Sequence, residues 1–441
     1  MKICVIGCGY VGLVTAAGFA AVGHTVECVD ANPERVASLC RGVVPIHEPG
    51  LADLMRSSIE AGRLRFTGVM AEALVGASVA FVCVGTPSND DGSVDLEHVL
   101  VAVREVAACA SGPLILAMKS TVPVGTGDRV CGIVAECPHP IAVLSNPEFL
   151  AEGRAVADFQ RPERVVIGMQ SQLTGHAADM LADLYRPFMR GGAPILIMRR
   201  RSAELTKYAC NAMLAARVSF VNEIARICDA VGGDIAEVRE GIATDSRIGP
   251  KFLYAGPSWQ GSCFLKDVRA LAALAAEHGV SRDMATATHQ SNLAHREWIL
   301  RILDAHARTF PDIGFAGARV AFWGLAFKAH SDDVRDSISL WLANRLAGTG
   351  ATIAAHDPQA AGAFVHALGP AEHVTYADTP MDAVQGADAL VLLTEWPEYA
   401  TPDWRGVKSA MRGTFVLDGR NTWRSSDVRA AGLRYQGIGA L

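Results

Sequence analysis

Three glycines near the amino end constrain the fold of this chain most. Gly7, Gly9 and Gly12 form the pattern G-x-G-x-x-G between an apolar stretch, KICVIG, and a helical pattern that runs to about Val22. In this context backbone amides can approach a pyrophosphate at the amino end of the helix. Asp30 ends the next predicted strand, where a carboxylate binds ribose hydroxyls and repels a 2′-phosphate. The pattern predicts NAD binding, and a purely structural tight turn is the alternative.

Strands and helices alternate through the first part of the chain. Further predicted strands are TVECVD, VAFVCVG (79–85), LILAMKS and IAVLSN. Such alternation predicts a parallel sheet that is covered by helices on both faces. Thr86 and Thr121 each follow one of these strands, at the edge where doubly wound sheets hold ligands. Both threonines are therefore candidate ligand-binding residues.

The same order of patterns returns near the carboxyl end. ARVAFWGLAF (318–327) resembles MKICVIGCGY, GATIAAHDP (350–358) resembles GHTVECVDAN, and QGADALVLLTEW (385–396) resembles VGASVAFVCVGTP (76–87). We interpret these matches as a second unit of the same design. Chance similarity between two α/β domains is the alternative.

A long helix is predicted between these two regions. Apolar residues recur at helical spacing from Ser202 to about Val231, and shorter helices follow to about residue 307. The fold class is therefore α/β, with two Rossmann-like doubly wound domains joined by a long central helix and a helical dimerisation region. We expect domains at residues 1–198, 199–310 and 311–441.

Composition limits the possible partners. The 441 residues carry a net charge of −6, which gives no electrostatic reason to expect nucleic acid and favours a small molecule. No apolar run approaches the roughly 18 residues of a membrane span. The 11 cysteines are scattered without paired metal-ligand spacing, so we expect no metal, reduced thiols and a cytoplasmic location.

Cys263 is the cysteine whose neighbours predict a reactive thiol. The segment GSCFLKDVRALAALAAEH (261–278) indicates a turn into a helix, with Ser262 as N-cap and Cys263 in the first turn. The helix dipole and the charge of Lys266 both favour the thiolate and predict a lowered pKa. Asp267 is expected on the same helix face. Four other cysteines lie in apolar segments and are interpreted as small buried hydrophobic residues: Cys4, Cys28, Cys83 and Cys228.

Two further pairs are spaced four residues apart. Lys207 and Asn211 would project from one side of the long helix, where an ammonium and an amide could face one reacting oxygen. A solvated surface pair is the alternative. Glu148 and Glu152, in NPEFLAEG (146–153), would place two carboxylates on one turn. Two such charges repel each other unless a site uses them.

Motifs along nearly the whole chain resemble one enzyme family. GCGYVG, VGTP, KSTVPVGT, NPEFLAEG, DSRIGPKFL, GSCFLKD, GLAFK and DDVRDS, in this order, are similar to motifs of the UDP-glucose/GDP-mannose 6-dehydrogenase family. The resemblance implies a homodimer or higher homo-oligomer. It also implies four-electron oxidation of a nucleotide sugar by two NAD, with a nucleotide-sugar-binding domain at the carboxyl end.

The resemblance also assigns catalytic roles. Cys263 would attack the aldehyde-level intermediate to give a thiohemiacetal, whose oxidation leaves a thioester that water cleaves. Lys207 and Asn211 would stabilise oxyanions. Asp267 with Thr121 would hold the water and relay protons, and Glu148 would act as base in thioester hydrolysis.

Binding residues follow from the same resemblance. Beyond the three glycines, those assigned to NAD are Tyr10, Val11, Asp30, Arg35, Thr86, Thr121, Glu152, Lys266 and Arg335. Those assigned to the nucleotide sugar are Glu148, Phe149, Leu150, Glu152, Lys207, Asn211, Arg247, Phe252, Leu253, Tyr254, Gln260, Gly261, Phe327, Lys328 and Arg420. A basic trio of Arg247, Lys328 and Arg420 suits a diphosphate.

One loop departs from the family pattern. Before GSC the family usually carries G-x-G-(F/Y)-G-G, whereas this chain has Gly-Pro-Ser-Trp-Gln-Gly at 256–261. Gln260 stands where a family glycine brings backbone close to the substrate, so its side chain either bonds the sugar or narrows the pocket. Leu265 also replaces a proline that is common in the family.

The substrate prediction therefore retains alternatives. SCFLKD, the RIG at 247–249 and LLTEWPEY favour UDP-glucose, while GDP-mannose or another nucleotide sugar is the nearest alternative. A catalytically silent NAD-binding regulator and a two-electron alcohol dehydrogenase are other readings. Neither of them needs Cys263, Lys207, Asn211 and Asp267 together.

Overall fold

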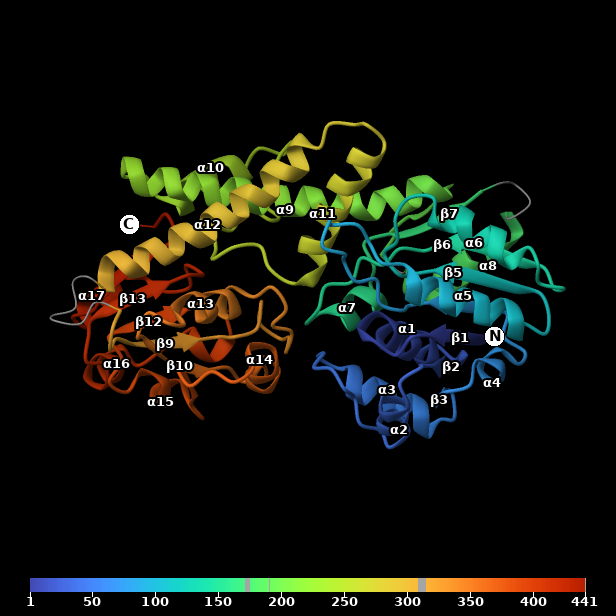
Figure 1. Cartoon of the computed structure of the whole chain (residues 1–441), viewed down its shortest axis with the longest axis horizontal. Coiled ribbons are helices and arrows are strands. Elements are labelled where there is room, and N and C mark those ends of the chain that lie inside the picture. The colour runs from blue at the N-terminus through green and yellow to red at the C-terminus, as the bar shows by residue number, and fades with distance from the viewer. Residues whose placement is uncertain (171–174, 190, 308–314, 441) are drawn as a thin grey trace. The chain divides into compact units, whose positions relative to one another are not determined.

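The computed structural model of the chain describes residues 1–170, 175–189, 191–307 and 315–440 (Figure 1). Its internal contacts divide the chain into two units. The first unit is Met1–Cys210 with Ala273–Val280, and the second is Asn211–Ala272 with Ser281–Leu441. No helix within the described ranges is long and apolar enough to cross a membrane.

The first unit is built on an eight-stranded sheet with the order β3-β2-β1-β4-β5-β6-β7-β8. Its strands are β1 (Lys2–Ile6), β2 (Thr25–Val29), β3 (Leu64–Thr67), β4 (Val79–Val82), β5 (Leu114–Met118), β6 (Ile141–Ser145), β7 (Val165–Met169) and β8 (Ile195–Arg199). The pairs from β3 to β6 are parallel, as the alternation predicts. β7 departs from this expectation because it runs antiparallel to β6.

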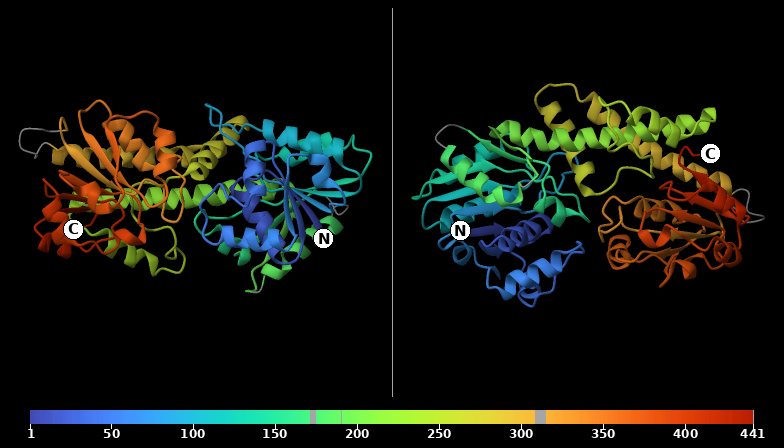
Figure 2. Two further views of the ribbon diagram at one scale, coloured as in Figure 1. Left: turned by 90° about the horizontal axis from the view of Figure 1, so that it is seen from below. Right: turned by 180° about the vertical axis from the view of Figure 1, so that it is seen from behind.

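Helices cover both faces of this sheet (Figure 2). The helices of this unit are α1 (Tyr10–Ala21), α2 (Pro33–Cys40), α3 (Leu51–Glu60), α4 (Met70–Leu74), α5 (Glu97–Cys109), α6 (Thr126–Val134), α7 (Ala155–Gln160), α8 (Gly175–Tyr185) and the 3-10 turn Arg186–Phe188. Side chains alternate along each strand, so Ile3 and Val5 of β1 pack with α1, α3, α7 and α8. Cys4 and Ile6 face α4, α5 and α6. Both faces are apolar because both are buried.

The second unit repeats the first six strands of this plan. Its parallel sheet has the order β11-β10-β9-β12-β13-β14. The strands are β9 (Arg319–Trp323), β10 (Thr352–His356), β11 (Val374–Tyr376), β12 (Ala389–Leu392), β13 (Phe415–Asp418) and β14 (Arg434–Gly437). The helices around it are α13 (Ile338–Leu346), α14 (Ala361–Leu368), α15 (Pro380–Val384), the 3-10 turn Pro397–Tyr399, α16 (Trp404–Ala410) and α17 (Ser425–Ala430).

The two units also share one turn in detail. Gly7 follows β1 with φ of +96°, and Gly324 follows β9 with φ of +97°. The amide of Gly7 donates to the carbonyl of Val29 at 2.8 Å, and the amide of Gly324 donates to the carbonyl of His356 at 2.9 Å. The sequence repeats around these positions therefore correspond to equivalent structure, and not to chance similarity.

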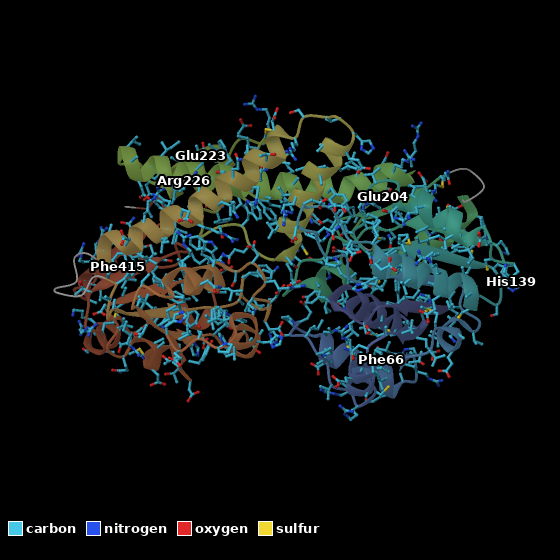
Figure 3. The ribbon with its side chains drawn as sticks, in the orientation of Figure 1. Phe66, His139, Glu204, Glu223, Arg226 and Phe415 are labelled. Atoms are coloured by element: carbon cyan, nitrogen blue, oxygen red, sulfur yellow. The ribbon has the colours of Figure 1, made fainter. Side chains whose placement is uncertain are left out.

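The central helices agree with the sequence pattern. They are α9 (Arg200–Val231), α10 (Ile235–Ala243), α11 (Ser262–Glu277) and α12 (Asp283–Ala307). The prediction of one long helix from Ser202 to Val231 is confirmed by α9, which is 32 residues long. Glu223 and Arg226 lie one turn apart on it (Figure 3), with 3.9 Å between their charged atoms. Its carboxyl-terminal part supplies Val221, Ala225 and Cys228 to the core of the second unit.

Candidate functional site

The glycine turn of the first unit has the geometry that a dinucleotide needs. A Cβ on Gly7 would lie 2.9 Å from the carbonyl oxygen of Cys83, and a Cβ on Gly12 would lie 1.8 Å from the carbonyl oxygen of Gly7. A side chain therefore fits at neither position, whereas Gly9 has open space around it. Gly9 is the N-cap of α1 and has no side chain that could accept hydrogen bonds from the first amides of the helix. An anionic ligand can accept them instead.

Asp30 lies beside this turn. Its carboxylate accepts hydrogen bonds from the amide of Cys8 at 2.7 Å and from the amide of Asn32 at 2.9 Å. The guanidinium of Arg35 lies 3.3 Å from the same carboxylate. Asp30 and Arg35, both predicted to contact NAD, therefore lie together at the end of β2. The first unit thus combines the loop, the helix end and the acid that adenosine diphosphate groups require.

Glu48 is a residue that the sequence analysis missed. It is buried and accepts the hydroxyl of Tyr10, the amide of Gly153 at 2.6 Å and the amide of Val156 at 3.2 Å. Glu48 thus connects the start of α1 to the segment that contains Glu152. Tyr10 lies 38 positions and Gly153 lies 105 positions from Glu48 in the chain, so the sequence around Glu48 does not indicate either partner.

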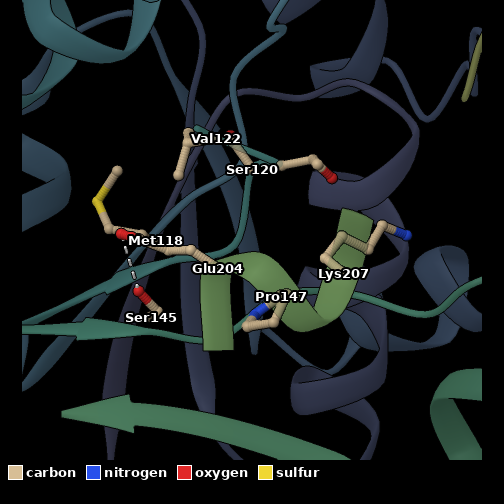
Figure 4. Close-up of a pocket in the computed structure, with 8 residues that line it drawn as sticks. Met118, Ser120, Val122, Ser145, Pro147, Glu204 and Lys207 are labelled. Carbon is tan, nitrogen blue, oxygen red and sulfur yellow. Dashed lines mark hydrogen bonds between the residues drawn. The ribbon is translucent and has the colours of Figure 1, made fainter. Parts of the chain in front are cut away.

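A small pocket lies where β5 and β6 end (Figure 4). Its lining residues are Met118, Ser120, Thr121, Val122, Ser145, Pro147, Glu204 and Lys207. The hydroxyl of Ser120 donates to the carbonyl of Val84 at 2.7 Å, so the loop with Thr121 adjoins the one that leads to Thr86. Both predicted threonines lie at the same edge of the sheet.

Glu148 and Lys207 form a buried ion pair. Lys207 Nζ lies 2.8 Å from Glu148 Oε1, and the two residues are 5% and 8% exposed, respectively. Burial alone would raise the pKa of Glu148, but the Lys207 ammonium and the amide of Leu150 outweigh it and hold the pKa below its usual value. The ring of Phe149 lies 5.5 Å from the ammonium. Lys207 is therefore no solvated surface residue.

The expected helical spacing of Glu148 and Glu152 is wrong. Residues 146–150 form a loop, and α7 begins only at Ala155. Glu148 bonds the amide of Leu150, two residues on, which is a local alternative to helical hydrogen bonding. Glu152 lies in the following turn and is half-buried.

Glu204 also escaped the sequence analysis. It is buried on α9 (Figure 3) and accepts the amides of Gly125 at 2.7 Å and Gly127 at 2.8 Å. These bonds attach the start of α9 to the start of α6. Its position three residues before Lys207 was the available signal, because both side chains occupy one face of the helix.

The second unit groups Asn211, Lys266 and Asp267. Asn211 Nδ2 donates to Asp267 Oδ2 at 2.6 Å, and Lys266 Nζ lies 2.6 Å from Asp267 Oδ1. Asp267 is 1% exposed, so its charge needs these partners. Cys263 is exposed near the start of α11, one turn before Asp267. Asn211 too is buried, which excludes a solvated Lys207–Asn211 pair.

The helix around Cys263 begins one residue earlier than predicted. α11 starts at Ser262 itself, after Gly261 with φ of +84°. Gly261 therefore takes the cap position expected for Ser262, because its positive φ turns the chain into the helix. By contrast, Cys4, Cys28, Cys83 and Cys228 are buried as predicted. Burial raises the pKa of Cys83 to about 12.

Some of the residues assigned to the sugar lie close together in the second unit. Arg420 donates to the carbonyls of Leu393 and Phe327, each at 2.8 Å. Lys328 Nζ lies 5.2 Å from the ring centre of Phe327, and a Cβ on Gly261 would lie 3.1 Å from the same ring. Phe327 is therefore the common neighbour of two members of the basic trio and of the loop before α11.

Other assigned residues have different surroundings. Arg247 pairs with Asp245 at 2.7 Å and is exposed, and Arg335 pairs with Asp333 at 2.7 Å. Tyr254 is exposed and stacks on Arg239, while Leu253 is buried. Phe252 has a positive φ of 60°. No group of three or more His, Cys, Asp or Glu side chains in the described ranges could hold a metal ion.

The Glu148–Lys207 pair predicts a pH-dependent loss of stability in Lys207→Met. Removal of the ammonium leaves a buried carboxylate unpaired, so we expect unfolding to need about 3 kcal/mol less at pH 8. Because the pKa of Glu148 is lowered in the folded protein, the pair stabilises above the unfolded-state pKa and loses this contribution as pH falls through the folded-state pKa. The difference in the free energy of unfolding between wild type and variant should therefore become smaller as the pH is lowered. Urea denaturation at several pH values measures it.

Two controls accompany this measurement. Lys251→Met changes an exposed lysine and should leave the urea midpoint nearly unchanged. Glu148→Gln combined with Lys207→Met removes the unpaired charge and should recover part of the loss. A loss of the same size at every pH, or a double variant as unstable as the single one, would contradict the expected role of the pair.

Comparison with known proteins gives the same picture over the whole chain. Three models of the UDP-glucose/GDP-mannose dehydrogenase family match: the NAD binding domain over residues 1–189, the central domain over 201–294 and the UDP binding domain over 321–425. UDP-glucose 6-dehydrogenase of Pseudomonas aeruginosa is 45% identical over 100% of this chain and 97% of its own length. The corresponding protein of Rhizobium meliloti is 41% identical over 100% and 99%.

Solved structures extend the comparison. The structure of a UDP-glucose dehydrogenase from the hyperthermophilic archaeon Pyrobaculum islandicum matches with a TM-score of 0.90 at 36% identity, over 100% of this chain and 98% of that one. The fold, the arrangement of the motifs and the full-length similarity agree. The chain belongs to the UDP-glucose/GDP-mannose dehydrogenase family.

Proposed function

We propose that this chain oxidises UDP-glucose to UDP-glucuronate and reduces two NAD for each sugar. The observation that carries the proposal is the exposed Cys263 at the start of α11, one turn before the buried Asp267 with its partners Asn211 and Lys266. Full-length similarity to relatives named UDP-glucose 6-dehydrogenase supports the choice of substrate. GDP-mannose and other nucleotide sugars are the competing substrates.

The first unit would hold the cofactor. Bound NAD would accept the hydride that leaves the sugar carbon in each of the two oxidations. The turn of Gly7, Gly9 and Gly12 and the first amides of α1, at Tyr10 and Val11, would bind the diphosphate, and Asp30 would bind the ribose. The further positions that we assign to the cofactor are Arg35, Thr86, Thr121, Glu152, Lys266 and Arg335.

Cys263 would carry the covalent step. Its sulfur forms a bond to the aldehyde carbon, and the carbonyl oxygen takes up a proton to give a thiohemiacetal. Loss of a hydride and a proton leaves a thioester. Water then adds to the thioester carbon, the carbon–sulfur bond breaks, and the carboxylate and the free thiol are released. Cys263 is well placed for this role because an exposed thiol at a helix start is both accessible and favoured as thiolate.

Buried polar groups would support these steps. Lys207 and Asn211 would stabilise the oxyanions, since a donor in a buried site acts more strongly than one in water. Glu148, kept ionised by Lys207, is suited to accept a proton from the attacking water. Asp267 and Thr121 would hold that water and relay protons.

We also propose the residues that would contact the nucleotide sugar. The residues that we propose are Glu148, Phe149, Leu150, Glu152, Lys207, Asn211, Arg247, Phe252, Leu253, Tyr254, Gln260, Gly261, Phe327, Lys328 and Arg420. The match of residues 321–425 to the UDP binding domain supports Phe327, Lys328 and Arg420 among them. The matched ranges also support the division into domains at 1–198, 199–310 and 311–441.

We also propose a cytoplasmic location. All 11 cysteines are free thiols in the structure, and five of them are buried. Free thiols in this number suit a reducing compartment. Fractionation of cells that express the chain would test the location, and recovery from an oxidising compartment would contradict it.

A homodimer is the proposed assembly, with α9 as its interface. Met213, Phe220 and Ile227 are 64%, 56% and 48% exposed and repeat every seven residues along α9. Such a repeat is typical of a helix that packs against another helix. It supplies an apolar surface that a second copy of the chain would cover.

Phe220→Glu tests this interface. A charge in the centre of the apolar repeat should weaken association, so we expect light scattering after gel filtration to shift from the dimer mass toward the monomer mass. Val365→Glu changes an exposed apolar residue of α14 and should leave the mass unchanged. A wild type that is monomeric, or a Phe220→Glu variant that keeps its mass, would contradict the proposal.

The proposed reaction predicts two NADH for each UDP-glucose consumed. Both oxidations reduce NAD, so absorbance at the NADH band and the amount of UDP-glucuronate should rise in a ratio of two to one. UDP-N-acetylglucosamine and GDP-mannose, offered in parallel, should react at least about tenfold more slowly. A ratio of one with released aldehyde would remove the thioester route, and faster turnover of GDP-mannose would change the substrate.

Cys263→Ser separates the covalent step from cofactor binding. We expect NADH formation to fall by at least about a hundredfold, with an aldehyde-level or covalent species retained, because a hydroxyl is a poorer nucleophile than a thiolate. NAD affinity should be unchanged, since the glycine turn lies in the first unit. Cys40→Ser, at another exposed cysteine, should react like the wild type. Loss of NAD binding in Cys263→Ser would show that the residue is misassigned.

A further inference from the structure

Gln260 replaces a glycine of the usual family loop, and the structure gives its side chain a defined place. The residue is 6% exposed, and its Oε1 accepts a hydrogen bond of 2.6 Å from the amide of Ile338. Ile338 is the first residue of α13, because Ser337 caps that helix. The first amides of a helix lack partners within the helix, so Gln260 satisfies one of them from another part of the second unit.

This bond also fixes the orientation of the side-chain amide. Only the oxygen of the amide can face an N–H donor, so Nε2 must point the other way. Nε2 is buried, and no described residue accepts a hydrogen bond from it. An unpaired buried donor lowers the stability of the folded protein. A glycine at this position would avoid this loss of stability. The Oε1 bond, or a contact of Nε2 with the bound nucleotide sugar, must therefore compensate for it.

The neighbouring residues of this loop are held in the same way. Asn292 exchanges two hydrogen bonds of 3.0 Å with the backbone of Trp259, and the indole of Trp259 donates to Ser219 at 2.8 Å. The amide of Gly256 donates to Asn222 at 3.0 Å. Polar side chains of α9 and α12 therefore fix the loop from two sides before it reaches Gln260.

A second bridge runs parallel to the Gln260 bond. Arg296 forms two hydrogen bonds with the carboxylate of Asp336, at 2.7 and 2.9 Å. The same guanidinium donates to Ser258 Oγ and to the carbonyl of Trp259, each at 3.3 Å. Ser258 also stands at a glycine position of the family loop. The two residues that replace family glycines, Ser258 and Gln260, thus both bond toward the segment at 336–338, Gln260 directly and Ser258 through Arg296.

From these contacts we infer that Gln260 is a positioning residue for Cys263. The bond from Gln260 to Ile338 holds Cys263 in place at the start of α11. The inference rests on the proposed function, because it takes Cys263 as the nucleophile. Only Gly261 and Ser262 lie between Gln260 and Cys263 in the chain, and Gly261 packs on the ring of Phe327. With glycine at 258 and 260 the loop would be flexible, whereas here Ser258 and Gln260 each form a hydrogen bond that fixes it. The thiol of Cys263 therefore keeps one position relative to Phe327.

Gln260→Met tests this role at nearly constant side-chain volume. Methionine cannot accept the bond from Ile338, so we expect kcat to fall by about tenfold through misplacement of the thiol. Alkylation of Cys263 by iodoacetamide, followed by mass spectrometry of its peptide, should slow by at least about twofold as the thiolate loses its place at the helix end. NAD affinity should stay the same.

Gln260→Glu keeps an acceptor toward Ile338 and removes the Nε2 donor. We expect kcat and the alkylation rate to return to within about threefold of wild type, because a carboxylate is favoured at a helix start. KM for UDP-glucose reports separately on any contact of Nε2 with the sugar. Gln359→Met, at an exposed position of the same unit, is the matched control and should change none of these quantities.

Ile338→Pro removes the same bond from its other partner. Proline is tolerated at the first position of a helix, and the extended backbone of Ser337, with ψ of 148°, suits a following proline. Ile338→Ala, which loses buried side-chain volume but keeps the N–H, is its reference. If Gln260 acts through this bond, Gln260→Met should slow kcat in the Ile338→Ala background but add little in the Ile338→Pro background.

Three outcomes would overturn the inference. These are a Gln260→Met variant with wild-type kcat and alkylation, a Gln260→Glu variant as slow as Gln260→Met, and additive effects of Gln260→Met and Ile338→Pro. Should Gln260→Met fail to fold, the two Ile338 variants compared with each other still decide the question. A wild type that makes no NADH from UDP-glucose would refute the proposed function alone, because the alkylation rates do not depend on the substrate.

Discussion

Five polar side chains on one face of α9 are buried, and each binds a group from another part of the chain. Glu204 accepts two amides at the start of α6, and Lys207 pairs with Glu148. Asn211 bonds Asp267, Ser219 bonds the indole of Trp259, and Asn222 bonds the amide of Gly256. A buried polar group without a partner costs several kcal/mol, so these pairings are strongly enforced. In the first unit these bonds attach α9 to the segment beside the pocket, and in the second unit they attach it to the loop before the thiol.

The two units share one fold but differ at the corner where the first would bind its cofactor. In the first unit α1 starts directly after the glycine turn, and Asp30 bonds one amide of that turn. In the second unit residues 324–337 separate β9 from α13, and Asp357 accepts the amides of Leu325 and Ala326 and the indole of Trp396. With these three donors on one oxygen, Asp357 is unsuited to bind a ribose. The corner of the second sheet therefore differs from the corresponding corner of the first in both its loop and its acid.

The regular elements could be predicted from the sequence because their signals are local. Short apolar stretches predicted β1, β2, β4, β5 and β6, and the helical period predicted α9 nearly to the residue. The loop residues could not be predicted in the same way. Glu48 bonds Gly153 across 105 positions and Glu204 bonds Gly127 across 77, and no local pattern indicates such partners.

The errors in the prediction have the same origin. Glu148 and Glu152 looked like one helical turn, but Glu148 instead bonds Lys207 and the nearby amide of Leu150. Ser262 looked like a cap, but the positive φ of Gly261 already turns the chain. In both places a tertiary contact or a backbone requirement outweighed the short-range pattern.

The cysteines show how the fold separates reactive from inert thiols. Burial raises the pKa of Cys4, Cys28 and Cys83, and a thiol with such a pKa stays protonated near neutral pH. Cys263 differs in having solvent access, a helix start behind it and a carboxylate one turn away that is already neutralised by Lys266. If that carboxylate were unpaired, its charge would oppose formation of the thiolate. The Lys266–Asp267 pair therefore protects the reactivity of the thiol as well as the stability of the buried acid.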